Sequence, residues 1–86
     1  MPKVSQFYGI KICLYAKEHG VSHFHAKYQG SEVSISIKTL EVLEGHIPGR
    51  ALSLVIEWAI AHRAELQAGW DALQNEELPK NIAPLN

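Results

Sequence analysis

The chain has 86 residues, of which 47% are hydrophobic and 20% charged, and its formal net charge is −1. This length and composition predict one globular domain over residues 1–86 and exclude both a disordered chain and a second core. The balanced charge argues against nucleic-acid binding over a broad surface, and a single cysteine excludes an intramolecular disulfide. Because no apolar run is long enough for a signal peptide or a membrane span, we expect a cytoplasmic protein that makes no contact with a membrane.

Alternation of polar and apolar residues in the first half of the chain predicts β-strands. Residues 7–15 predict one strand. Residues 23–28 and 32–38 predict a hairpin around a turn at residues 29–31, where a glycine fits a positive φ. Residues 40–43 form a further extended piece before a break that contains glycine and proline. We therefore expect an antiparallel meander of three or four strands.

The second half of the chain changes to the period of a helix from about Pro48, whose missing N–H does no harm in a first turn. Apolar residues at i, i+3 and i+4 form one broad face, on which Trp58 and Trp70 are expected to be core anchors. The pattern fades through residues 75–78, and Pro79 ends the helix. The predicted fold is α+β, with the meander packed against one long C-terminal helix.

Histidine is the one conspicuous excess in the composition: the chain has five, and His19, His23 and His25 lie close together in the sequence. Side chains two residues apart share one face of a strand, so His23, His25 and Lys27 should lie together, with Phe24 on the opposite face. In the simplest hairpin register, the serines of the next strand lie beside the histidines. We expect the helix to cover the Phe24 face, which leaves the histidines on the outer face.

The histidines could bind a divalent transition metal, zinc or nickel, because imidazole nitrogen suits these ions. His23 and His25 would supply two ligands from one strand and His19 a third from the preceding turn. A carboxylate such as Glu18 or Glu32, or a water, would complete the shell. His62 could replace the third ligand only if the helix approached the same face. We expect His62 to pack on the opposite side.

Acid–base chemistry without a metal is the alternative use of this face. His23 and His25 are candidate proton-transfer residues, and Lys27 or Lys11 is a candidate for holding a phosphate. Ser34 and Ser36 lack the Gly-x-Ser-x-Gly context of a nucleophilic serine, so the sequence gives no support to a serine triad.

Segments spread over nearly the whole chain resemble the bacterial domain of unknown function 4160 family. They are residues 7–10, His19, residues 23–26, 40–45, 50–52, 57–59 and 62–66, Trp70 and residues 82–85. Family members commonly carry two prolines before the histidine motif, where this chain has Val21 and Ser22, so we expect a differently shaped turn. The resemblance implies a small bacterial protein encoded beside another small protein. A shorter stretch, made of residues 21–24, a turn and the strand at residues 32–37, also resembles the histidine strand of HicA-type RNA-cleaving toxins.

These observations predict first a partner-binding component of a two-gene system, toxin–antitoxin-like or regulatory, that binds the small protein encoded nearby. The alternative is a small histidine-dependent nuclease or metal-assisted hydrolase. The enzyme hypothesis requires the clustered histidines to converge in a concave, partly shielded pocket, whereas the binding hypothesis leaves them on an open face. Leu52, Ile56 and Ile60 lie on one flank of the predicted helix and predict a homodimer.

Overall fold

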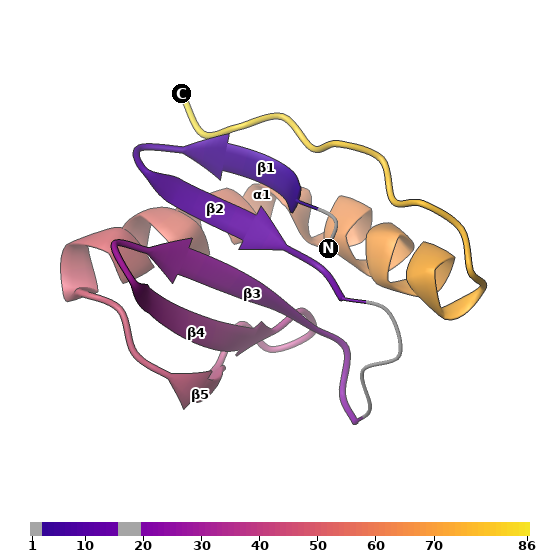
Figure 1. Ribbon diagram of the computed structural model, residues 1–86, viewed down its shortest axis with the longest axis horizontal. Helices are drawn as coiled ribbons and strands as arrows, with labels where there is room; N and C mark the ends of the chain where they lie inside the picture. The colour runs from indigo at the N-terminus through magenta and orange to yellow at the C-terminus, as the bar shows by residue number, and fades with distance from the viewer. Residues whose placement is uncertain (1–2, 16–19) are drawn as a thin grey trace.

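The computed structural model describes residues 3–15 and 20–86, which form one antiparallel sheet and one helix (Figure 1). The elements are β1 (Lys3–Phe7), β2 (Ile10–Cys13), β3 (His23–Tyr28), β4 (Ser31–Ser36), β5 (Val42–Gly45) and α1 (Gly49–Gln74). The strands follow one another in the sheet in chain order, as a meander. The α+β prediction is confirmed, but the described residues form five strands, and the prediction of three or four was wrong.

The extra strand arises because residues 7–15 are not one strand but the end of β1, a tight turn and β2. Tyr8 and Gly9 form that turn with φ values of 49° and 78°. Two consecutive positive φ values are typical of the two-residue hairpin turn whose twist matches the flanking strands. The alternation of the sequence runs through the turn without a break, and β1 itself contains a register shift between Lys3 and Ser5. The polar–apolar alternation of the sequence therefore did not reveal the turn.

The β3–β4 hairpin has the predicted arrangement, because its turn and its register both follow the sequence pattern. Gln29 and Gly30 form the turn with positive φ values of 47° and 82°. Phe24 pairs with Ile35, and the next residue, His25, pairs with Ser34. The apolar side chains of both strands therefore lie on one face, and the histidines and serines lie on the other, as expected.

The two edges of the sheet differ in how they are covered. On the β1 edge, the C-terminal tail runs alongside the strand, and the Ile82 backbone N–H donates a hydrogen bond to the Val4 carbonyl at 2.7 Å (Figure 1). The other edge is β5, whose four residues are all exposed. Gly45 ends β5 with a φ of +84°, and a Cβ at this position would lie 2.2 Å from the Glu32 carbonyl oxygen. Only glycine fits this close approach of β5 to β4.

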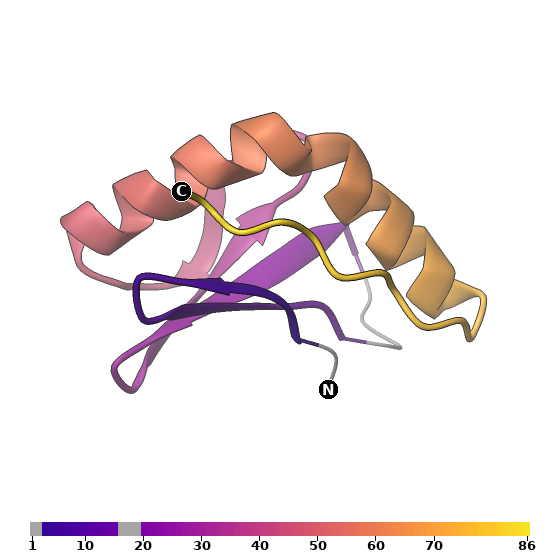
Figure 2. The ribbon, with the colours of Figure 1, turned by 90° about the horizontal axis from the view of Figure 1, so that it is seen from above.

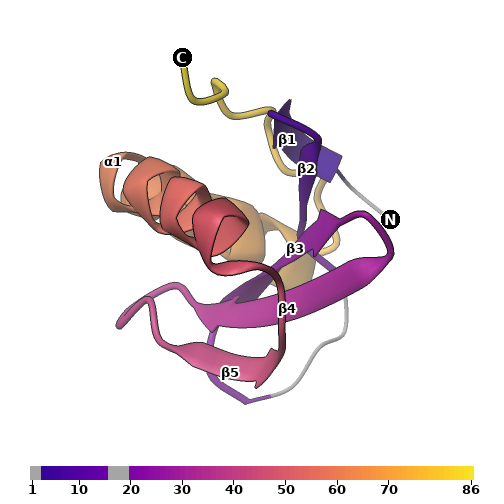
Figure 3. The same cartoon turned by 90° about the vertical axis from the view of Figure 1, so that its left-hand side faces the viewer.

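Helix α1 covers one face of the sheet, and among the described residues no second helix covers the opposite face (Figure 3). Pro48 precedes its first turn, as the sequence predicts. The first half of the helix packs on the core, where the Trp58 ring lies 6.3 Å from Phe24 and 5.4 Å from Phe7 between centroids. No helix of the described residues is long and apolar enough to cross a membrane.

The helix is bent at His62, whose φ of −121° and ψ of 21° are not helical (Figure 2). The second half therefore runs past the end of the sheet where β3 begins. Ser22 donates its hydroxyl hydrogen to the Gln67 side-chain oxygen at 3.0 Å, which ties the start of β3 to this half. The bend also brings Gly69 against Leu14, so closely that an added Cβ would lie 2.7 Å from a Leu14 methyl group.

Candidate active site

The outer face of the sheet, which we call the histidine face, is built from alternate residues of β2, β3 and β4 and from Tyr15, two residues beyond the end of β2. Its described members are Lys11, Cys13, Tyr15, His23, His25, Lys27, Glu32, Ser34 and Ser36. Cys13 lies opposite His25 in the sheet, and Ser34 lies opposite His25 on the other side. Strand geometry alone therefore places these side chains side by side.

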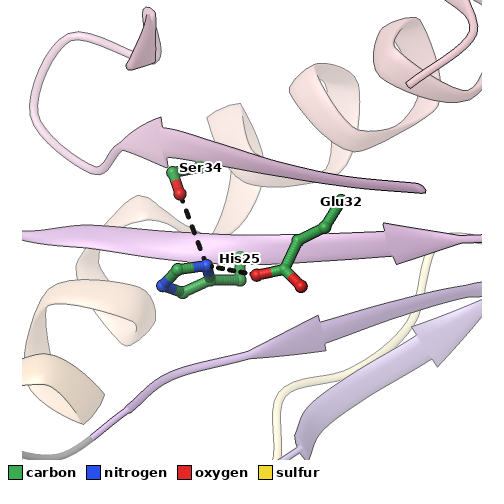
Figure 4. A network of polar contacts seen from close by, with 3 residues as sticks. All are labelled: His25, Glu32 and Ser34. Atoms are coloured by element: carbon green, nitrogen blue, oxygen red, sulfur yellow. Dashed lines mark hydrogen bonds and ion pairs between the residues drawn. The ribbon is translucent and has the colours of Figure 1, made fainter. Parts of the chain in front are cut away.

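His25 lies at the centre of the histidine face and is held by a carboxylate. Its Nδ1 lies 2.8 Å from Glu32 Oε2 and 3.3 Å from the Ser34 hydroxyl (Figure 4). An ionised carboxylate only accepts hydrogen bonds, so the hydrogen on Nδ1 is donated by His25, and Nε2 is the proton-accepting nitrogen of the neutral ring. The His25 side chain is only 12% exposed, against 45% for Glu32. The pair is thus partly shielded from solvent and fixes one tautomer.

His23 is the second histidine of the face, and its tautomer is fixed in the same way. Its Nδ1 donates to the Val21 carbonyl oxygen at 2.8 Å, because a carbonyl oxygen only accepts. Its ring lies 5.1 Å from His25 and 5.0 Å from Trp70 between centroids. His23 and His25 therefore lie side by side on one face of β3, as their spacing of two residues predicts.

Lys27 continues the same line along β3 and is positioned by Tyr15. Its Nζ lies 5.5 Å from the centre of the Tyr15 ring, and the same ring meets His25 edge-on at 4.5 Å. A side-chain hydrogen bond with Tyr15 raises the pKa of Lys27 above its ordinary value. The ammonium group therefore stays charged at neutral pH and supplies a positive charge beside the histidines.

The histidine face is hollowed on both sides of His25. One pocket, of about 220 Å³, is lined by Val21, His23, Ser34, Leu43 and Glu44. A second pocket, of about 290 Å³, has Lys11, Lys27 and Glu32 among its lining residues. His23 lines the first pocket, Lys27 and Glu32 line the second, and His25 lines neither. The enzyme hypothesis, which requires the clustered histidines to share one pocket, therefore stays a prediction.

The metal hypothesis depends on a residue that the structure does not describe. His19 lies outside the described residues, so a zinc or nickel site made by His19, His23 and His25 stays a prediction. Within residues 3–15 and 20–86, no group of three or more His, Cys, Asp or Glu side chains is placed to hold a metal ion. His62 is not near this face: its Nδ1 lies 2.6 Å from Glu65 Oε1 and its ring packs on Trp58, on the core side.

Two residues of the site were not predicted as neighbours of the histidines. Tyr15 lies two residues beyond Cys13, and its edge-on contact with His25 depends on the orientation of both side chains. Trp70 was predicted as a core anchor, and it is 7% exposed. Its contact with His23 depends on the bend at His62, where neither proline nor glycine gives a signal.

No curated protein and no solved structure matches this chain. The model of one protein family, described as a domain of unknown function, matches residues 9–71, which include the whole of β2, β3, β4 and β5. The matched segment covers well over half of the sequence and carries all of the described members of the histidine face. The chain therefore belongs to the family of the domain of unknown function DUF4160.

Proposed function

We propose that this protein is a small histidine-dependent nuclease that cleaves RNA without a metal ion. The observation that carries the proposal is the His25–Glu32 pair, at 2.8 Å, with His23 beside it at 5.1 Å on a partly shielded face. Imidazole is the side chain that both accepts and releases protons near neutral pH. A pair of histidines beside a lysine therefore provides a base, an acid and a positive charge for a phosphate.

The proposed reaction is transfer of the phosphoryl group within the RNA strand. His25 accepts the proton of a ribose 2′-hydroxyl, and the 2′-oxygen attacks the adjacent phosphorus. The bond from phosphorus to the 5′-oxygen of the next nucleotide breaks, and protonated His23 gives that oxygen its proton. The products are a 2′,3′-cyclic phosphate and a free 5′-hydroxyl. Glu32 stabilises the His25 imidazolium formed on the way, and Lys27 stabilises charge on the phosphate oxygens.

The balanced net charge of the chain limits the kind of substrate contact but does not conflict with this proposal. Lys11 and Lys27 face each other across β2 and β3, so the positive charge of the site is local. Binding through so few phosphate contacts depends only weakly on salt, because few counterions are released. We therefore expect a small RNA footprint rather than a long binding track.

The test is cleavage of a single-stranded RNA oligonucleotide by the purified protein in the presence of EDTA. His25→Ala should lower the cleavage rate by about 10²–10⁴-fold, the usual contribution of acid–base catalysis. His46→Ala is the matched control, because His46 is exposed and lies outside the histidine face; it should leave the rate unchanged. Equal rates for wild type and His25→Ala would refute the proposal.

A second candidate function is binding of a small protein partner encoded nearby, in the cytoplasm of a bacterium. The observation that favours it is the uncovered β5 edge, where Val42 and Leu43 are 45% and 47% exposed. The opposite edge is covered by the tail at Ile82. Co-purification of the neighbouring gene's product with the tagged chain tests it: Val42→Glu should abolish co-purification, and Ile60→Glu, which changes an exposed apolar residue of the helix, should not. Retention of the partner by Val42→Glu excludes this edge as the interface.

The homodimer stays a prediction, and the helix flank offers less accessible apolar surface for it than the sequence indicated. Leu52 and Ile56 are half-buried and pack against the core, whereas Ile60 is 63% exposed. Of the three residues that predicted the contact, Ile60 therefore offers most of the accessible surface. Light scattering that gives a mass near 9.6 kDa at micromolar concentration would contradict the dimer.

A further inference from the structure

The pocket beside His23 is the candidate binding site that the proposed chemistry leaves unused. Its lining combines two apolar side chains, Val21 and Leu43, with His23, Ser34 and Glu44. Val21 and Leu43 are 57% and 47% exposed, although each would be more stable in contact with another apolar surface. The lining of this pocket is therefore partly apolar and partly polar.

The register shift in the β4–β5 pairing explains why Leu43 and Glu44 both reach this pocket. In a regular strand, neighbouring side chains point to opposite faces. Here the pairing shifts between Ser34 and Ile35, so that Val42 pairs with Ile35 while Glu44 pairs with Ser34. Leu43 is the extra residue of this bulge, and bulges re-aim side chains next to functional sites.

Glu44 is the polar group of the pocket that is available to a ligand. Within the described part of the chain, its carboxylate makes no hydrogen bond or ion pair. Glu44 lies directly opposite Ser34, and the Ser34 hydroxyl lies 3.3 Å from His25 Nδ1. Ser34 therefore connects the pocket with the His25–Glu32 pair, because it lines the pocket and contacts His25.

We infer that this pocket binds one nucleobase of the RNA substrate and selects guanine; the inference rests on the proposed nuclease function. A carboxylate accepts two parallel hydrogen bonds from adjacent N–H groups. Guanine alone among the four RNA bases presents two such donors on its Watson–Crick edge, and single-stranded RNA is read through unstacked bases held in this way. Glu44 would accept from guanine, while Val21 and Leu43 contact the faces or rim of the ring.

The size and position of the pocket fit a base rather than a whole nucleotide. Its volume of about 220 Å³ is below the range of roughly 300–1,000 Å³ for drug-sized ligands. His25 follows His23 on the same face of β3, about 7 Å further along, because a strand rises by about 3.3 Å per residue. This spacing is short enough that the ribose and phosphate attached to a base held beside His23 can reach His25, where the proposed cleavage begins.

The experiment measures binding of nucleotides too short to be cleaved, which separates this inference from the nuclease proposal. Guanosine 3′-monophosphate and adenosine 3′-monophosphate are titrated into the isotope-labelled full chain and followed by NMR. We expect guanosine to bind about tenfold more tightly, the scale of one bidentate base contact, and to shift resonances of Val21, His23 and Leu43. Glu44→Gln should reduce the affinity for guanosine to that for adenosine. Glu41→Gln, which changes a nearby exposed carboxylate outside the pocket, should keep the preference.

Two results would overturn the inference: equal affinities in the wild-type protein, or a guanine preference that survives in Glu44→Gln. Leu43→Ala adds a second measurement, because loss of an apolar wall should weaken both nucleotides by a similar factor. RNA cleavage that depends on His25 but shows no base preference would refute the guanine pocket and leave the nuclease proposal standing. A guanine preference in a protein that cleaves no RNA would support the pocket and refute the nuclease.

Discussion

Substitution of Gly45 by alanine tests how β5 is held against the rest of the sheet. Two separate costs follow from the structure. The φ of +84° disfavours any residue with a Cβ, by about 1–2 kcal/mol. The new Cβ would also lie 2.2 Å from the Glu32 carbonyl oxygen, a backbone atom that cannot swing away. Relief of such overpacking costs about 1–3 kcal/mol. Together they predict a loss of about 2–5 kcal/mol in the free energy of unfolding.

Gly30→Ala separates the two costs, because Gly30 has nearly the same φ of +82° but no atom within 4 Å of an added Cβ. It should lose only about 1–2 kcal/mol. The assay is urea denaturation followed by fluorescence of the two buried tryptophans, Trp58 and Trp70. The melting temperature is a second measure, which Gly45→Ala should lower by at least about 8 °C in a domain of this size. A loss for Gly45→Ala no larger than that for Gly30→Ala would refute the reasoning.

Three further substitutions test separate contacts. Trp58→Phe removes the hydrogen bond of 2.8 Å from the indole N–H to the Ala83 carbonyl, so stability should fall by about 1–3 kcal/mol and proteases should remove the tail faster. Tyr15→Phe should lower the pKa of Lys27 toward its ordinary value of 10.5, which an NMR titration would follow. Because the folded state raises this pKa, the stability that the contact adds is present at neutral pH and is lost as the pH rises through the folded-state pKa. Ser5→Ala removes a buried hydroxyl that has no hydrogen-bond partner among the described residues, and it should raise stability by up to about 1 kcal/mol in urea denaturation.

The parts of the fold that sequence predicted well are those with one strong local signal. The bounds of β3 and the faces of the β3–β4 hairpin follow from strict alternation and a glycine turn, and so does the grouping of His23, His25 and Lys27. The helix begins after Pro48 as predicted. The turn at Tyr8 and Gly9 escaped prediction because alternation continues through it.

The parts of the site that sequence could not predict depend on contacts between distant segments. The bend at His62 has no proline or glycine to mark it, yet it decides that Trp70 reaches the histidine face. Glu32 was predicted near the histidines, but its bond to His25 Nδ1 depends on how both side chains turn. The bulge that re-aims Leu43 appears only when β4 and β5 are paired, so the pocket could not be foreseen.

The products of RNA cleavage give the most direct test of the central claim that His23 and His25 perform acid–base catalysis without a metal. A defined RNA oligonucleotide is incubated with the wild-type chain in EDTA, and the ends formed are identified by mass spectrometry. The account predicts 2′,3′-cyclic phosphate and 5′-hydroxyl ends, no cleavage of an oligonucleotide with 2′-deoxyribose throughout, and loss of both products in His23→Ala and His25→Ala. No cleavage by the wild-type chain, or cleavage only after a divalent metal is added, would contradict it.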